Sequence, residues 1–176
     1  MLVPPVNKLS APRDQSVAPS KGDSSMPLSV EDTLAIVSLS NAQMRSLDDH
    51  DVDAWVAAWV PDGTFIATYG TFAGHAEIRA FIDGHIAAGK EDGARHLMTN
   101  YVVDGDGDRA TITCAVTKLQ VEKPPFIIAS GIYRDVVVRT DEGWRFESRQ
   151  LDIDRGVFAR AELAAAEIDG EAGVNA

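Results

Sequence analysis

The sequence has little of three things: cysteine, positive charge and long apolar runs. Cys114 is the only cysteine among 176 residues, so the chain can form neither an internal disulfide nor a cysteine-rich zinc site. The 16 Lys and Arg residues are outnumbered by 27 Asp and Glu residues, and this net charge of −11 argues against a nucleic acid partner. No apolar run approaches the roughly 18 residues that a membrane-spanning helix needs. The N-terminus also lacks the features of a signal peptide, so we expect a cytoplasmic protein with no membrane partner.

The chain length predicts one globular domain between two tails. Residues 1–28 are rich in Pro, Ser, Lys and Asp, and they offer too little apolar surface to offset the entropy of ordering, so we predict a disordered or loosely docked tail. Whether Met1 or Met26 is the natural start stays open. Residues 160–176 form a second tail that could hold a short helix before it frays. The domain itself is expected to span residues 29–159.

The first part of the domain has the apolar spacing of a helix. Ser29 is a plausible N-cap with Asp32 three residues later, a variant of the capping box, and the helix is expected to end near Asp48. The residues expected to form its buried face are Leu34, Val37, Met44 and Leu47.

The following residues predict two more helices and a strand between them. Asp51 can cap a second helix over residues 52–60, which turn chemistry at residues 61–63 would end. A strand is predicted over residues 65–69 and a third helix over residues 75–88.

From Leu97 onward the apolar period changes from that of a helix to that of a strand. Long strands are predicted over 97–103, 110–121, 126–139 and 144–153. The Asp-Gly-Asp-Gly-Asp run at residues 104–108 looks like the opening of a calcium loop. Its twelfth position is Ala115, which has no carboxylate, so a hairpin turn is predicted instead. Three helices followed by long antiparallel strands indicate an α+β fold, in which a bent sheet wraps the helices and leaves a cone-shaped pocket.

Six short motifs add to this pattern through their order. They are the run Met44–Asp51, the pair Trp55 and Trp59, and the runs 61–65, 95–100, 131–133 and 144–149. In this order and spacing they resemble the SnoaL-like branch of the NTF2-like superfamily, over about residues 29–158. The resemblance implies a small α+β cone protein.

The resemblance also implies an Asp–His pair. Superfamily members with such a pair include the scytalone dehydratases and the lindane dehydrochlorinases, and Asp48 and His96 fall on its two positions. Arg149 falls on an arginine that lines the dehydrochlorinase pocket, and Tyr133 falls on an aromatic pocket position. Gln43 stands where the dehydrochlorinases have an active-site lysine, so the substrate-activating groups differ and neither named reaction transfers.

The resemblance makes His96 a candidate general base, because an imidazole titrates near working pH. Asp48 would accept a hydrogen bond from the other ring nitrogen and stabilise the imidazolium; the alternative is a structural bond between helix and sheet. Strand alternation predicts that Arg145, Glu147 and Arg149 share one face. Arg149 would there bind a substrate oxygen, or else form an ion pair on the sheet surface.

Three aromatic residues, Tyr133, Tyr69 and Trp55, are candidates for the pocket wall, as stacking surfaces or hydrogen-bond donors. The alternative for each of them is packing in the core. No spacing of His, Cys, Asp or Glu predicts a metal site, and no cofactor motif is present.

The predicted function is that of a cofactor-independent lyase or isomerase, which acts by elimination or by a double-bond shift on a small hydrophobic cyclic molecule. The alternative is a non-catalytic ligand-binding or structural subunit, such as the β subunits of ring-hydroxylating dioxygenases, which share the superfamily. The last two predicted strands carry more apolar residues than one face needs, so we expect a homodimer or homotrimer; the resemblance to the members with an Asp–His pair is what suggests the trimer.

Overall fold

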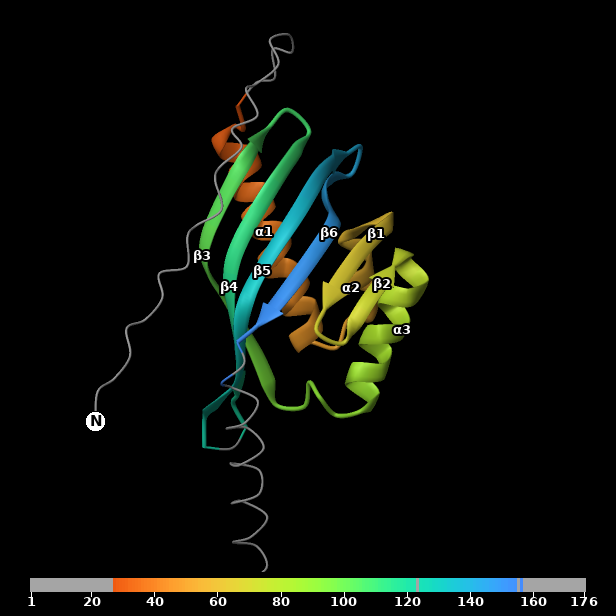
Figure 1. Cartoon of the computed structure of the whole chain (residues 1–176), viewed down its shortest axis with the longest axis vertical. Helices are drawn as coiled ribbons and strands as arrows, with labels where there is room; N and C mark the ends of the chain where they lie inside the picture. Colours follow the sequence, from red (N-terminus) through yellow and green to blue (C-terminus); the bar gives the residue numbers. More distant parts are fainter. Residues whose placement is uncertain (1–26, 123, 155, 157–176) are drawn as a thin grey trace, which may run out of the picture.

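The computed structural model describes residues 27–122, 124–154 and 156 of the chain (Figure 1). Its elements in chain order are α1 (Val30–Asp48), α2 (Val52–Ala57), β1 (Trp59–Ala67), β2 (Gly70–Ala73), α3 (Gly74–Ala87), β3 (Ala94–Asp106), β4 (Arg109–Gln120), β5 (Phe126–Thr140) and β6 (Gly143–Ile153). Most of the predicted N-terminal tail lies outside the described residues, as does the whole predicted C-terminal tail, including the short helix that was expected there. Of residues 27–28, Pro27 forms a bridge with Asp106 and Leu28 packs against the core.

The six strands form one sheet in the order β2-β1-β6-β5-β4-β3. Every neighbouring pair is antiparallel except β1 and β6, which run parallel. Helix α1 packs across the sheet against β3 and β6, whereas α3 packs against β1 and β2 (Figure 1). The predicted α+β class, with a curved and mostly antiparallel sheet over three helices, is confirmed.

The caps of the first two helices are the predicted ones. The Ser29 side chain accepts a hydrogen bond from the Asp32 backbone N–H at 3.0 Å, and the Asp51 carboxylate accepts one from the Ala54 backbone N–H at 3.0 Å. The predicted buried face of α1 was partly wrong, because Leu34 is 60% exposed. The face that meets the sheet instead comprises Ile36, Ser40, Gln43, Met44 and Leu47.

The second helix ends earlier than its spacing predicted. It stops at Ala57, and Trp59 already belongs to β1, where it pairs with Phe146 of β6. The two rings lie 5.4 Å apart between centroids, so burial against β6 prevails over the helical spacing of the tryptophans. The predicted turn at residues 61–63 is instead an irregular stretch within the strand, where the pairing with β6 shifts register. Strand β2 was not predicted.

A bulge in β6 decides which residues face the core. Val136 pairs with Ser148 and Val137 pairs with Phe146, so Glu147 is an extra residue that inverts the alternation of the strand. Phe146 before the bulge and Arg149 after it are therefore both buried, although they differ in parity. The prediction that Arg145 and Glu147 share a face with Arg149 was wrong for this reason.

The long hairpins follow the prediction closely. β3 and β4 are joined at Gly107-Asp108, within the acidic run that was predicted to be a turn, and β5 and β6 are joined at Asp141-Glu142. Along β4 the residues Ala110, Ile112, Cys114 and Val116 are buried against the helices. None of the helices in the described residues is both long and apolar enough to cross a membrane.

Candidate functional site

The inner side of the sheet holds an apolar cavity of about 460 Å³. Helices α2 and α3, strand β1 and the ends of β4, β5 and β6 enclose it. Its aromatic and aliphatic walls include Trp55, Phe65, Phe81, Val116, Tyr133 and Leu151. A cavity of this size and lining is typical of a site for a small apolar molecule.

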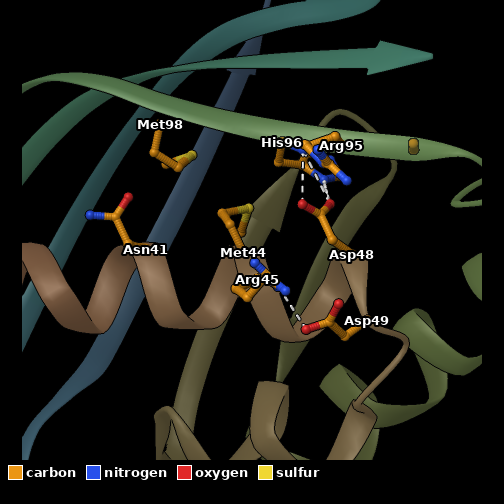
Figure 2. Close-up of a pocket in the computed structure, with 9 residues that line it drawn as sticks. Asn41, Met44, Arg45, Asp48, Asp49, Arg95, His96 and Met98 are labelled. Carbon is orange, nitrogen blue, oxygen red and sulfur yellow. Dashed lines mark hydrogen bonds and ion pairs between the residues drawn. The ribbon is translucent and has the colours of Figure 1, made fainter. Parts of the chain in front are cut away.

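His96 lines this cavity and is in contact with Asp48; Figure 2 shows the contact between the two side chains. Asp48 is the last residue of α1 and His96 the third residue of β3, the strand at the edge of the sheet. Nδ1 of His96 lies 2.7 Å from Oδ1 of Asp48, within the reach that a catalytic pair needs. The backbone N–H of His96 also donates to both carboxylate oxygens, at 3.1 Å each. Asp48 therefore fixes both the backbone and the ring of His96.

The two residues of the pair differ in what they face. His96 lines the apolar cavity, and Asp48 does not. Because Nδ1 is bonded to a carboxylate, it carries the proton in the neutral ring, and Nε2 is the nitrogen left with a free lone pair. Among the described residues no side chain or backbone group is hydrogen-bonded to Nε2 of His96.

A second, polar cavity of about 270 Å³ lies on the other side of the pair, between α1 and β3 (Figure 2). Its charged lining is made by Arg45, Asp49 and Arg95 together with Asp48 and His96. Arg45 is paired with Asp49 at 2.7 Å. The carboxylate of Asp48 therefore has a polar surrounding behind it, whereas the imidazole in front of it lines an apolar space.

The structure brings all three predicted aromatic residues to the apolar cavity. Trp55 and Tyr133 are almost fully buried, and burial raises the pKa of the Tyr133 phenol. Tyr69 is half-exposed at the rim, where it contacts the imidazole of His85 edge-on. Burial raises the pKa of Tyr69 as well, so both phenols keep their protons at neutral pH.

Arg149 lies beneath the cavity wall. Its side chain is 0% exposed and lines neither cavity, because the ring of Tyr133 lies 3.8 Å from the guanidinium carbon. The guanidinium donates to Gln43 and, at 3.2 Å, to Ser40 on α1, and it pairs with Asp135 at 3.3 Å. In this arrangement Arg149 supports Tyr133 and α1 and has no direct path to a bound molecule.

Two charged residues at the cavity were not predicted. Lys118 of β4 and Glu91 of the segment before β3 both line it, and they form an ion pair at 2.6 Å. A lysine in a strand and a glutamate after a helix are usually exposed to solvent, so the sequence positions of Lys118 and Glu91 did not predict a place at the cavity. The only available hint was the strand alternation, which places Lys118 on the same side of β4 as Val116. Within the described residues, no three His, Cys, Asp or Glu side chains gather as metal ligands.

The comparisons with known proteins place the chain in a family. The model of the SnoaL-like domain matches residues 28–150, and the chain therefore belongs to the SnoaL-like domain family. No curated protein matches this sequence.

Solved structures share the fold. A protein of unknown function with a cystatin-like fold from Nostoc punctiforme is 25% identical, with a TM-score of 0.69 over 75% of this chain and 98% of that chain. A proposed aromatic ring hydroxylase from Novosphingobium aromaticivorans is 29% identical, with a TM-score of 0.63 over 72% of this chain and 91% of that chain. A proposed scytalone dehydratase from the same organism is 23% identical, with a TM-score of 0.62 over 71% and 85%, and this likeness shows the fold alone.

Proposed function

We propose that this protein is a cofactor-independent lyase or isomerase that removes a proton from carbon in a small hydrophobic cyclic substrate. The observation that carries the proposal is the position of the pair: His96 lines an apolar cavity, and Asp48 holds its Nδ1 from behind at 2.7 Å. Membership of the SnoaL-like family supports this proposal.

The chemistry needs only groups that the chain supplies. Nε2 of His96 takes the proton as the C–H bond breaks, and the released electron pair forms a new double bond in the substrate. In an elimination a leaving group departs with its electrons; in a double-bond shift the imidazolium returns the proton to another carbon. Asp48 stabilises the imidazolium in either case, and the apolar walls strengthen this interaction because they exclude water.

A second candidate is a non-catalytic ligand-binding or structural subunit. It is favoured by the two hydrogen bonds from the His96 backbone N–H to Asp48, because such backbone bonds serve to join strand and helix and are not needed for catalysis. The same cavity would then hold a ligand, and the His96–Asp48 bond would tie β3 to α1 without chemistry. The expected homodimer or homotrimer and the cytoplasmic location remain predictions under both candidates.

Hydrogen–deuterium exchange tests the proposal without knowledge of the natural substrate. The protein is incubated in D₂O with a panel of cyclic carbon acids, with and without a carbonyl group, 2-tetralone and indene among them, and NMR follows the loss of C–H signal. We expect exchange above the buffer rate for at least one compound, abolished in His96→Ala and retained in His85→Ala, which removes the other imidazole of the cavity. Exchange at the buffer rate for the whole panel would favour the ligand-binding candidate.

A further inference from the structure

The ion pair between Lys118 and Glu91 is unusually well buried for a pair at a cavity. The side chain of Lys118 is 14% exposed and that of Glu91 is 3% exposed. Burial of two charges carries a large desolvation penalty that their mutual attraction must offset, so this pair contributes little net stability. Its position beside the candidate base suggests another use.

Lys118 is the direct neighbour of His96 across the sheet. The two residues are paired in the antiparallel register of β3 and β4, so their side chains leave the same face. The Cβ atoms of such a pair lie about 4.5–5.5 Å apart. Both residues line the apolar cavity. A cation and the proposed general base thus stand side by side in a predominantly apolar cavity.

The ammonium of Lys118 has donor capacity to spare. It has three N–H donors, of which one goes to Oε2 of Glu91 at 2.6 Å and one to the backbone carbonyl of Lys90 at 2.8 Å. No third acceptor is hydrogen-bonded to it among the described residues. These two bonds hold the ammonium in place and leave one N–H for a bound molecule.

The other cations near the site are less suited to meet a ligand in this cavity. Arg149 is sealed behind Tyr133, and Arg45 and Arg95 line the polar cavity on the far side of the pair. Lys90 is exposed to solvent at the rim. Lys118 is therefore the buried cation of the apolar cavity within the described part of the chain.

We propose that Lys118, positioned by Glu91, is the residue of this site that binds the carbonyl oxygen of the substrate. This inference rests on the proposed function. When His96 takes the proton from the carbon beside the carbonyl group, the C–H electron pair moves into a new C=C bond. The carbonyl π pair then moves to oxygen, which leaves an enolate next to the Lys118 ammonium. No oxidant or other reactant is needed.

The pairing of charges explains why Glu91 is part of the device. The Lys118–Glu91 pair is neutral as a whole, which lowers the cost of keeping an ammonium in an apolar wall. An enolate that forms at the free N–H lies nearer to the Lys118 ammonium than to the Glu91 carboxylate, so the net interaction is attractive. Stabilisation that grows as charge develops on the substrate acts on the transition state, which is the condition for a faster reaction.

Binding of 2-naphthol tests this inference without catalysis. Its naphtholate has the shape and charge of the 2-tetralone enolate, and its phenol, like that of tyrosine at about 10, titrates well above histidine. The pKa of the bound ligand is measured from its absorbance. We expect the wild type to bind naphtholate at least tenfold more tightly than naphthol, which lowers the bound pKa by one unit or more.

The variants separate Lys118 from general effects of charge and folding. Lys118→Met is expected to abolish the preference for naphtholate, and Lys90→Met, which removes an equal charge at the rim, is expected to retain it. Because Lys118→Met leaves Glu91 buried without its partner, the double variant Lys118→Met/Glu91→Leu provides the same test in a chain with no orphaned charge. A preference that survives in the double variant, or a wild type that does not bind 2-naphthol or binds it with an unchanged pKa, overturns the inference.

The two proposals fail in different ways. A lowered naphthol pKa without deuterium exchange in any carbon acid would reject His96 as the base and leave Lys118 as an oxygen-binding residue. Exchange in 2-tetralone that is lost in His96→Ala but undiminished in the double variant would reject Lys118 alone.

Discussion

Two aspartates on the inner side of the sheet are each paired with a basic side chain, and they show how differently one fold uses the same kind of contact. Asp48 accepts three hydrogen bonds from two N–H groups of His96, and the pair lies between the apolar and the polar cavity. Asp135 and its partner Arg149 are both 0% exposed, and their closest approach is 3.3 Å. Neither oxygen of Asp135 has a hydrogen-bond partner among the described residues.

The difference lies in what the surroundings do to the charge. Burial raises the pKa of Asp135 to about 7, although the guanidinium of Arg149 acts to lower it. The buried Asp135–Arg149 pair, called the sealed pair below, therefore has a desolvation penalty and no access to a ligand. Its contacts hold Tyr133 and α1 in place. The Asp48–His96 pair opens on a cavity, where under the proposed function a change of charge would act on a bound substrate. The two pairs have similar residue types, and what distinguishes them is whether a bound molecule can reach them.

The largest expected effect is on kcat of the proposed reaction, when the Asp48–His96 pair is changed. His96→Ala should lower kcat by roughly 10²–10⁴, the range that general-base catalysis supplies, once a substrate is in hand. The double variant Asp48→Asn/His96→Ala should be hardly slower than the worse single variant, because the two residues act as one unit. Steady-state kinetics and a melting curve check this. Full activity at a lower Tm would make His96 a structural residue.

The next effect is on the stability of the sealed pair. Arg149→Met should lower the free energy of unfolding by about 3–5 kcal/mol, because it leaves the buried polar groups of Asp135, Gln43 and Ser40 without the donor they share. Arg109→Met is the matched control, since its pair with Glu147 is exposed to solvent, where an ion pair contributes little to stability. Urea unfolding measures both. Equal losses in the two variants would mean that burial does not set the value of the pair.

The sealed pair also predicts a dependence of stability on pH. The pKa of Asp135 rises from 3.8 to about 7 on folding, so the folded state binds the proton more tightly. Its contribution to stability is fully present below pH 3.8 and is lost as pH rises to about 7. Compared with Asp135→Asn, the wild type should therefore lose stability across this window. Parallel curves for the two proteins would show that Asp135 is ionised at all these pH values.

The smallest expected effect has the opposite sign and comes from a third aspartate, near the surface. Hydrogen bonds from Arg139, Trp144 and Ser29 lower the pKa of Asp32 to about 2. Its contribution to stability is present above pH 3.8 and is lost as pH falls through about 2. Asp32→Asn should consequently be less stable than the wild type at neutral pH, with the difference vanishing in strong acid. A difference that persists at pH 2 would contradict this assignment.

The sequence predicted the four long strands and the caps of the first two helices, because these depend on local periodicity and on single side chains. It predicted the Asp48–His96 contact only through resemblance, since spacing cannot pair residues that are 48 positions apart. It could not predict the exposure of Leu34 or the burial of Glu91, because both depend on which neighbours cover them. It placed Arg149 on the face of Arg145 because one alternation was carried through the whole strand, although the apolar residues change parity between Phe146 and Leu151.

The bulge at Glu147 has a consequence for comparing this chain with its relatives. The half of β6 after the bulge is out of phase with the half before it, so the register of any alignment through residues 146–149 decides which residue is matched to Arg149. A relative without the extra residue would present the aligned side chain to the opposite side of the sheet. Functional residues in this strand should therefore be transferred between family members by superposing structures and not by counting along the sequence.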